Sequence, residues 1–290
     1  MTKWLLTICI MGAWLIMPGG DAMAVANPPP DTLDVVTVYG ERPGFTRLEY
    51  GMNLGFYLAS PSTANYYNGS GTNNLESALT RYHNYEAIRR EIGYDFSLHG
   101  LPQNMNYRPS MMLGFFAAIN LSRSAGFLAE FNYSRLRAED QFTLLIDKFS
   151  NIEGDNIELY TIWGVEERNE LRFSFRYTFV SRQGYVHPFI EAGTSITDTK
   201  VKENRVRVRS HTFSILNPQD LFYHQRDYGI GMGGFGSIGL KMDVNEQFAL
   251  TLGYSANYSQ INLGENEAFA LQHTAFIRLN LNTLFRSTAL

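Results

Sequence analysis

The sequence predicts an all-β chain that closes into an antiparallel transmembrane barrel of about eight strands. Three observations predict it: an export signal, long segments in which apolar and polar residues alternate, and connections that alternate between short and long. Soluble strands average about five or six residues, whereas about ten residues cross hydrocarbon at a tilt. A soluble β-sandwich is the alternative. Segment length argues against it, as do the aromatic residues near segment ends: Tyr50, Tyr133, Tyr177, Tyr254, Tyr258 and Phe285.

Composition narrows the function classes. Of the 290 residues 44% are hydrophobic and 18% charged, and the formal net charge is −4. These values exclude a disordered chain and argue against a nucleic-acid binder, which would carry a basic excess. The single cysteine, Cys9, lies in the export signal, so the processed chain has no disulfide and no cysteine-ligated metal.

Residues 1–24 are expected to be a secretory signal peptide. Lys3 precedes an apolar run from Trp4 to Met17, and two small-x-small cleavage patterns follow at 22–24 and 24–26. The run is shorter than the roughly 20 residues that a spanning helix needs, so an uncleaved anchor is the weaker alternative. The signal and the alternating segments together predict location in the bacterial outer membrane, in contact with its lipid.

Residues 25–46 are expected to form a periplasmic tail stiffened by consecutive prolines. Its segment LDVVTVYG at 33–40 resembles the TonB box, which pairs with a periplasmic protein by strand addition. The resemblance names the apolar side chains of this segment as candidate contacts. An ordered tail packed beneath the barrel is the alternative. The candidate contacts are Leu33, Val35, Val36 and Val38.

Residues 47–285 are expected to form the barrel, followed by a short tail at 286–290. The alternation is clear in eight segments, 48–58, 110–121, 127–134, 171–179, 190–197, 228–244, 248–258 and 271–285.

The lengths of the connections between the segments predict the orientation of the barrel in the membrane. Short turns at 122–125, 181–184 and 245–247 would face the periplasm, and the connections at 59–109, 139–168, 198–227 and 264–268 would face outward. Three of the outer connections are long, and β-prone pieces within them predict strands that extend beyond the membrane. One piece, Ile92 to Leu98, could instead start another transmembrane hairpin and give ten strands. The other pieces are Glu158 to Val165 and Arg205 to Phe213.

Charged residues on the polar faces predict the contents of the lumen. Glu191 is expected opposite Ser174 and diagonal to Arg172 and Arg176. An eight-stranded barrel has an interior that side chains just fill, so an ion-pair network is expected to plug it, with inward glycines making room. A gated ion path is the alternative use of the same charges. The eight residues are Glu49, Glu130, Arg172, Arg176, Glu191, Lys241, Asp243 and Arg278.

No motif predicts catalysis, a cofactor or a metal. The GxGxxG match at 229–234 continues into strand alternation instead of a helix, so it lacks the context of a dinucleotide site. The six histidines have no ligand spacing, and GxSxG is absent. Three arginines, Arg205, Arg207 and Arg209, are expected on one strand face of an outer connection. They could bind an anionic polysaccharide or an acidic partner, or protect a solvated strand edge.

Several segments together resemble the small outer-membrane β-barrels of the OmpA/OmpX and PorT-like kind found in Bacteroidetes. They are YGMNLG at 50–55, GFLAEFNYS at 126–134, PFIEAG at 188–193, GSIGLK at 236–241 and the strand ending at Phe285. The resemblance implies insertion by the barrel assembly machinery, with Phe285 as its recognition residue. It does not imply one biochemical role.

Three functions follow, in order of preference. The first is a non-enzymatic surface protein with a plugged lumen, whose loops bind a partner or complete an envelope or secretion complex. The second is a small-solute channel. The third is an enzyme that modifies envelope lipid.

Overall fold

The computed structural model describes residues 48–71, 73–148, 156–180, 185–216, 228–245, 247–263 and 266–283. The expected signal peptide, the tail at 25–46 with its TonB-box-like segment, Phe285 and residues 286–290 lie outside this part of the chain. Those expectations therefore stay predictions.

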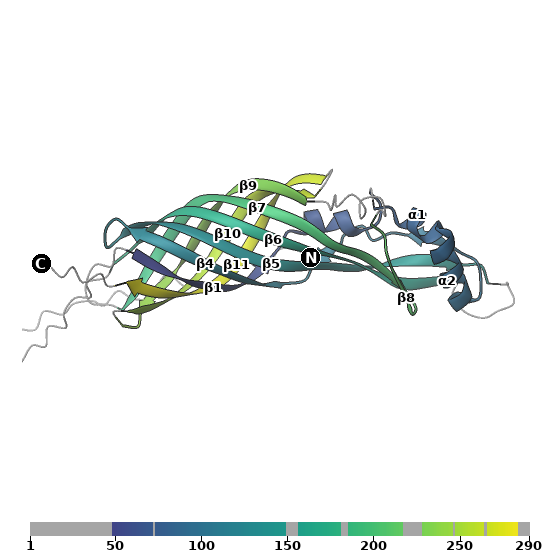
Figure 1. Ribbon diagram of the computed structural model, residues 1–290, viewed down its shortest axis with the longest axis horizontal. Coiled ribbons are helices and arrows are strands. Elements are labelled where there is room, and N and C mark those ends of the chain that lie inside the picture. The colour runs from purple at the N-terminus through teal and green to yellow at the C-terminus, as the bar shows by residue number, and fades with distance from the viewer. Residues whose placement is uncertain are drawn as a thin grey trace, which may run out of the picture. The chain divides into compact units, whose positions relative to one another are not determined.

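The described strands form a closed ring. Each neighbouring pair is antiparallel, and pairing of the first strand with the last completes the ring (Figure 1). The ring confirms the predicted eight-stranded barrel. Its strands are β1 (Leu48–Leu58), β4 (Ser110–Asn120), β5 (Ala125–Ile146), β6 (Ile157–Thr178), β7 (Val186–Val208), β9 (Tyr228–Asp243), β10 (Phe248–Leu263) and β11 (Asn266–Thr283).

Successive side chains of these strands point alternately into the lumen and outward. On β1, Glu49 and Asn53 are buried in the lumen, whereas Leu54 is 46% exposed. Register brings outward residues of neighbouring strands together, as in the row of Leu113, Leu54 and Ile277. The result is a continuous apolar belt around the ring. A belt of this extent on a closed barrel is a lipid-facing surface.

Three strands of the ring continue past the belt as an open extension of the same 11-stranded sheet, and this extension is called the second sheet below. The extended parts of β5, β6 and β7 are flanked by β2 (Phe96–Gly100) on β5 and β8 (His211–Ser214) on β7, and the short β3 (Asn106–Tyr107) also pairs with β5. The expected extension of strands beyond the membrane is thus confirmed. The ten-strand alternative is wrong, because β2 pairs with the far end of β5 and does not enter the ring.

The long connection after β1 contains helices that the sequence analysis did not predict: η1 (Pro61–Tyr67), α1 (Leu75–Thr80) and α2 (Tyr82–Ile92). Asn74 caps α1 by accepting a hydrogen bond from the Ser77 amide at 2.8 Å. Gly93 ends α2 in the left-handed conformation, with φ of 83°. Ile92 is therefore the last residue of a helix and not the start of a strand.

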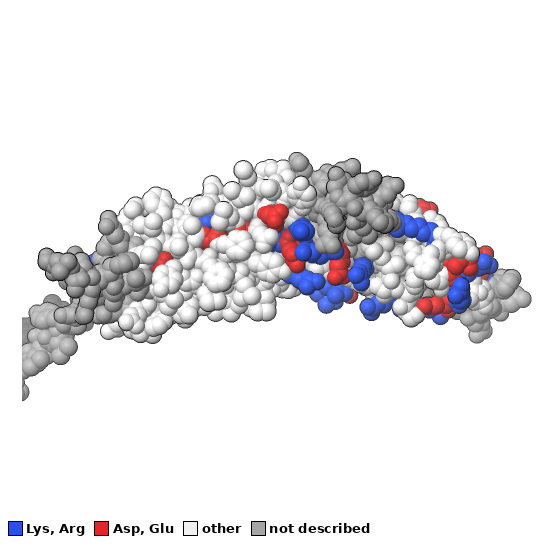
Figure 2. All heavy atoms as spheres, in the orientation of Figure 1, with Lys and Arg blue, Asp and Glu red and all other residues white. Residues whose placement is uncertain are grey.

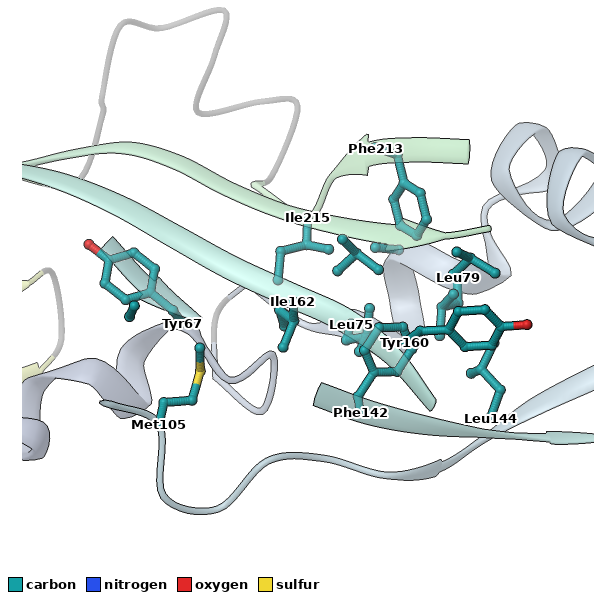
Figure 3. Packing of buried hydrophobic residues seen from close by; sticks show 14 of the residues in the cluster. Tyr67, Leu75, Leu79, Met105, Phe142, Leu144, Tyr160, Ile162, Phe213 and Ile215 are labelled. Atoms are coloured by element: carbon teal, nitrogen blue, oxygen red, sulfur yellow. The ribbon is translucent and has the colours of Figure 1, made fainter. Parts of the chain in front are cut away.

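The helices close over the inner face of the second sheet. Leu75 and Leu79 of α1 lie in one buried cluster with inward residues of the sheet such as Phe142 (Figure 3). Ile88 and Ile92 of α2 belong to the same cluster, which draws residues from β5, β6, β7 and β8. The cluster buries Phe142 and many other side chains that continue the inward face of the barrel strands. We call this second sheet with its helices the extracellular module, after the predicted outward orientation of the long connections. It has an apolar core, in contrast to the polar lumen below it.

Candidate functional site

The lumen holds most of its charges in three clusters along its length. The cluster nearest the short turns contains Glu49 of β1, which is fully buried. Arg176 of β6 forms an ion pair with one carboxylate oxygen, and the Lys241 ammonium lies 2.5 Å from the other. The Asn280 amide donates a third contact at 3.2 Å. Side chains of four different strands thus meet at one carboxylate.

The middle cluster is organised by Arg278 of β11. Its guanidinium donates two hydrogen bonds to Glu191, at 2.6 and 3.0 Å, and forms an ion pair with Glu130. The ring of Phe276 lies 4.3 Å from the guanidinium carbon. All three charged residues are nearly inaccessible to solvent. A bidentate guanidinium held between two carboxylates crosses the lumen and fixes opposite walls of the barrel.

The expected partner of Glu191 is wrong. The β6–β7 register places Glu191 opposite Arg176, two residues from the expected Ser174, because the last residue pair of this hairpin joins Thr178 to Phe189 and not to His187. The connection is therefore longer than the four-residue turn on which the expectation rested. Arg278, from the far wall, is its partner instead.

Arg172 pairs with a carboxylate of its own strand. Its guanidinium lies 2.7 Å from Glu170 and packs over the ring of Phe235 at 4.9 Å. Asn257 donates a hydrogen bond to Glu170 and accepts one from the Ser195 hydroxyl at 3.1 Å. This pair lies between the middle cluster and the third one.

The third cluster closes the lumen beneath the extracellular module. Arg168 and Glu166 of β6 are paired at 2.6 Å and buried. The hydroxyls of Tyr67 and Tyr107 donate to the same Glu166 oxygen, at 2.6 and 3.0 Å. Burial raises the pKa of both phenols well above the ordinary value, so they stay protonated donors.

Arg168 also ties η1 to the barrel wall. It donates to the Tyr57 hydroxyl of β1 at 3.1 Å, to Thr63 of η1 at 3.2 Å and to Gln272 of β11 at 3.3 Å. A Cβ at Gly164 would collide with the ring of Tyr67, so glycine there lets η1 approach β6 closely. The contacts of Arg168 hold η1 across the barrel mouth.

The structure thus brings six of the eight predicted lumen residues into two clusters. Glu49 joins Arg176 and Lys241, Glu130 joins Glu191 and Arg278, and Arg172 lies near them with another partner. Asp243 stands apart at the end of β9, 3.3 Å from His187. Sequence reasoning missed Glu166, Arg168 and Glu170. These residues occupy the alternate, inward-pointing positions that precede Arg172 on the same strand. Extending that alternation backwards would have found them.

The three predicted surface arginines do not share one face. Arg205 and Arg207 lie on the outward side of β7, but Arg209 follows the end of that strand, in a turn where its φ is 51°. Its guanidinium lies 3.4 Å from Glu158 and donates to the Glu91 carbonyl of α2 at 3.3 Å. The expectation for Arg209 is therefore wrong, because the strand ends at Val208 and the chain turns back into β8.

Two features are absent from the described residues. These residues hold no group of three or more metal-ligating side chains. Within the same ranges, no helix combines the length and the hydropathy needed to cross a membrane.

No protein-family model and no curated protein sequence matches this chain. Solved structures that are similar include Neisserial surface protein A, with a TM-score of 0.43 and 10% identity over 81% of this chain and 97% of the other. OprG of Pseudomonas aeruginosa has a TM-score of 0.37 and 10% identity over 83% and 98%. Ail of Yersinia pestis, in complex with the heparin analogue sucrose octasulfate, has a TM-score of 0.35 and 9% identity over 82% of this chain and 99% of the other.

The geometry of the chain itself is that of a transmembrane β-barrel of the outer-membrane type. The antiparallel ring is closed, its exterior is apolar around the whole belt, and its interior is polar. On this scaffold the candidate sites are the ion-paired lumen and the exposed surface of the extracellular module.

Proposed function

We propose that this protein is a non-enzymatic outer-membrane barrel with a side-chain-filled lumen, whose extracellular module binds a partner at the cell surface or within an envelope complex. One observation carries the proposal: Arg168, Arg172 and Arg278 are each about 1% exposed although they lie inside the barrel. A water-filled pore would leave such side chains solvated. Instead, each meets a carboxylate from the barrel wall.

The module supports the second part of the proposal. Its apolar core and the contacts of Arg168 hold it as a rigid element above the barrel. Rigid elements lose little conformational entropy when they bind, so they suit recognition. Insertion by the barrel assembly machinery with Phe285 as recognition residue, and contact of the tail at 33–38 with a periplasmic protein, are parts of the same proposal.

Single-channel recording of the refolded full chain in planar bilayers tests the filled lumen. We expect no large, steady openings from the wild-type protein. Arg172→Ala/Arg176→Ala should show openings, because two long side chains leave the lumen. Heat-modifiable mobility on a gel checks that this variant folds. Large openings from the wild type would overturn the proposal.

A small-solute channel is the second candidate, and one observation favours it. Several buried polar atoms of the lumen have no partner among the described residues, including Asn53 Oδ1, Ser174 Oγ and Ser237 Oγ. Such atoms suit ordered water, so a narrow water path is the form that this candidate would take. It predicts small, ion-selective conductance instead of silence.

An enzyme that acts on envelope lipid is the third candidate. A screen of the refolded protein for lipid deacylation or acyl transfer tests it, and turnover would overturn the non-enzymatic proposal.

A further inference from the structure

The outward face of the extracellular module carries an excess of positive charge next to the lipid-facing belt. We call its residues the arginine face: Arg108, Arg135, Arg137, Lys200, Lys202, Arg205 and Arg207, with the acidic residues Glu139, Glu167, Asp198 and Glu203 among them. Basic residues outnumber acidic ones here, although the whole chain has a net charge of −4. Figure 2 shows basic side chains gathered just beyond the nearly uncharged surface of the barrel strands.

The ion pairs on this face do not neutralise all of its positive charge. Glu139 is shared by Arg108 and Arg137, each at 3.0 Å. Glu203 is shared in the same way by Arg135 and Arg205, at 3.9 and 3.4 Å. One carboxylate cannot neutralise two guanidinium groups, so each shared pair keeps a net positive charge and unused N–H donors.

The Trp163 indole holds two arginines of the face in place, Arg137 and Arg207. The guanidinium carbons of Arg137 and Arg207 lie 5.3 and 5.5 Å from the ring centre of Trp163. Arg207 also donates to Thr212 at 3.4 Å, and no ion pair to it exists among the described residues. Cation–π contacts of this kind fix the side chains before any ligand arrives.

The face lies where lipid headgroups must be. Tyr133 of β5 lies at the end of the lipid-facing belt, and Arg135 is the next outward residue of the same strand. From Glu167 to Thr161, strand β6 carries the face a further roughly 20 Å along its length. This zone begins at the hydrocarbon boundary and extends away from it.

We infer that the arginine face binds the phosphate groups of glycolipid headgroups in the outer leaflet. Guanidinium groups bind phosphate through paired N–H donors, and the face presents several of them at headgroup height. The inference rests on the proposed placement in the outer membrane. It names lipid phosphate as a partner of the module.

Energy transfer from Trp163 tests the inference, because this residue lies within the face. The full chain with Trp4→Phe and Trp14→Phe keeps one tryptophan. It is reconstituted into phosphatidylcholine bilayers that contain traces of dansyl-labelled lipid A with both phosphates, or of dansyl-labelled phosphatidylcholine. We expect stronger transfer to lipid A, and loss of the difference at high salt.

A charge variant makes the test specific. Arg108→Ser/Arg135→Ser/Arg205→Ser leaves both arginines that stack on Trp163 and should weaken lipid A enrichment on the order of 100-fold, since each basic residue near an anionic surface contributes. Arg90→Ser/Arg123→Ser is the control, because both residues are exposed and lie outside the face. It should bind lipid A like the wild type, and heat-modifiable mobility confirms folding of both variants.

Two results would overturn the inference. One is equal transfer to both labelled lipids in the wild type. The other is binding of soluble heparin to the face without lipid A enrichment, which would assign it to a soluble polyanion. Either result leaves the filled lumen intact, because channel recording measures the lumen independently.

Discussion

Arg278 is the residue on which two buried carboxylates depend. Its guanidinium contacts both Glu130 and Glu191, and no second cation is paired with either among the described residues. Arg278→Ala should therefore destabilise the folded barrel by about 3–5 kcal/mol, because it leaves two charges buried without a partner. Unfolding of the protein by guanidinium chloride in lipid vesicles measures the change in the free energy of unfolding.

A control and a rescue make this prediction specific. Arg123→Ala removes an exposed arginine in a short turn and should change stability by no more than about 0.5 kcal/mol. Glu130→Leu/Glu191→Leu/Arg278→Met removes all three charges and should recover most of the loss. If Arg278→Ala were as mild as Arg123→Ala, the middle cluster would not stabilise the fold.

At the scale of elements, α2 is tied to the β7–β8 turn by one carboxylate. The amide of Ser210 donates to Glu91 at 3.0 Å, and the Ser210 hydroxyl donates to the other oxygen. These hydrogen bonds lower the pKa of Glu91 below its ordinary value of 4.5. The folded pKa is below the unfolded one, so the stabilisation is present above pH 4.5 and is lost as pH falls through the folded pKa.

Hydrogen exchange along α2 checks this dependence. Exchange corrected for its intrinsic rate should speed up on acidification below pH 4.5. Glu91→Gln should give fast exchange at neutral pH already, and Glu86→Gln on the same helix should behave like the wild type. Acid-independent exchange in the wild type would show that this tether does not hold the helix.

Substitution of two outward leucines tests whether lipid or water surrounds the strand face on which each of them lies. Leu54 of β1 lies in the belt and is 46% exposed, whereas Leu159 of β6 lies in the module and is 64% exposed. Leu54→Arg should cost about 2–4 kcal/mol, the penalty for a charge in hydrocarbon, and Leu159→Arg should cost almost nothing. Equal effects on vesicle unfolding would contradict a lipid-facing belt.

Strand alternation made the ring predictable. Apolar residues such as Tyr50 and Leu54 recur with period two because each strand lies between lipid and the polar lumen. Apolar and polar residues therefore alternate along the sequence. The inward side of the same strands yielded Glu49, Glu130 and Arg278 as lumen residues. Parity alone was enough to place them inside the barrel.

Register and helices were harder to predict. The partner of Glu191 depends on a hairpin register and on Arg278 from the far wall, neither of which follows from local pattern. The helical connection gave signals in Asn74 and Gly93, but its apolar residues are spread over two short helices. Short helices give weak periodicity, and tertiary packing on the second sheet stabilises them.

At the scale of the whole molecule, one set of strands serves three environments. The belt contacts lipid, the lumen is filled by ion pairs, and above the belt the same inward faces pack an apolar core. Continuous strands such as β6 therefore change their surroundings along their length. One part of each long strand then anchors the protein in the membrane, and another part of the same strand belongs to the surface that is proposed to bind a partner.

Spin-label accessibility tests this arrangement most directly. With Cys9→Ser, single cysteines replace outward Leu252 or inward Ser255 of β10, and collision with oxygen and with a water-soluble nickel complex is measured in lipid vesicles. We predict that the label at 252 meets oxygen but not nickel, and that the label at 255 meets neither. Nickel collisions at 252 would place the belt in water, and nickel collisions at 255 would show an open pore.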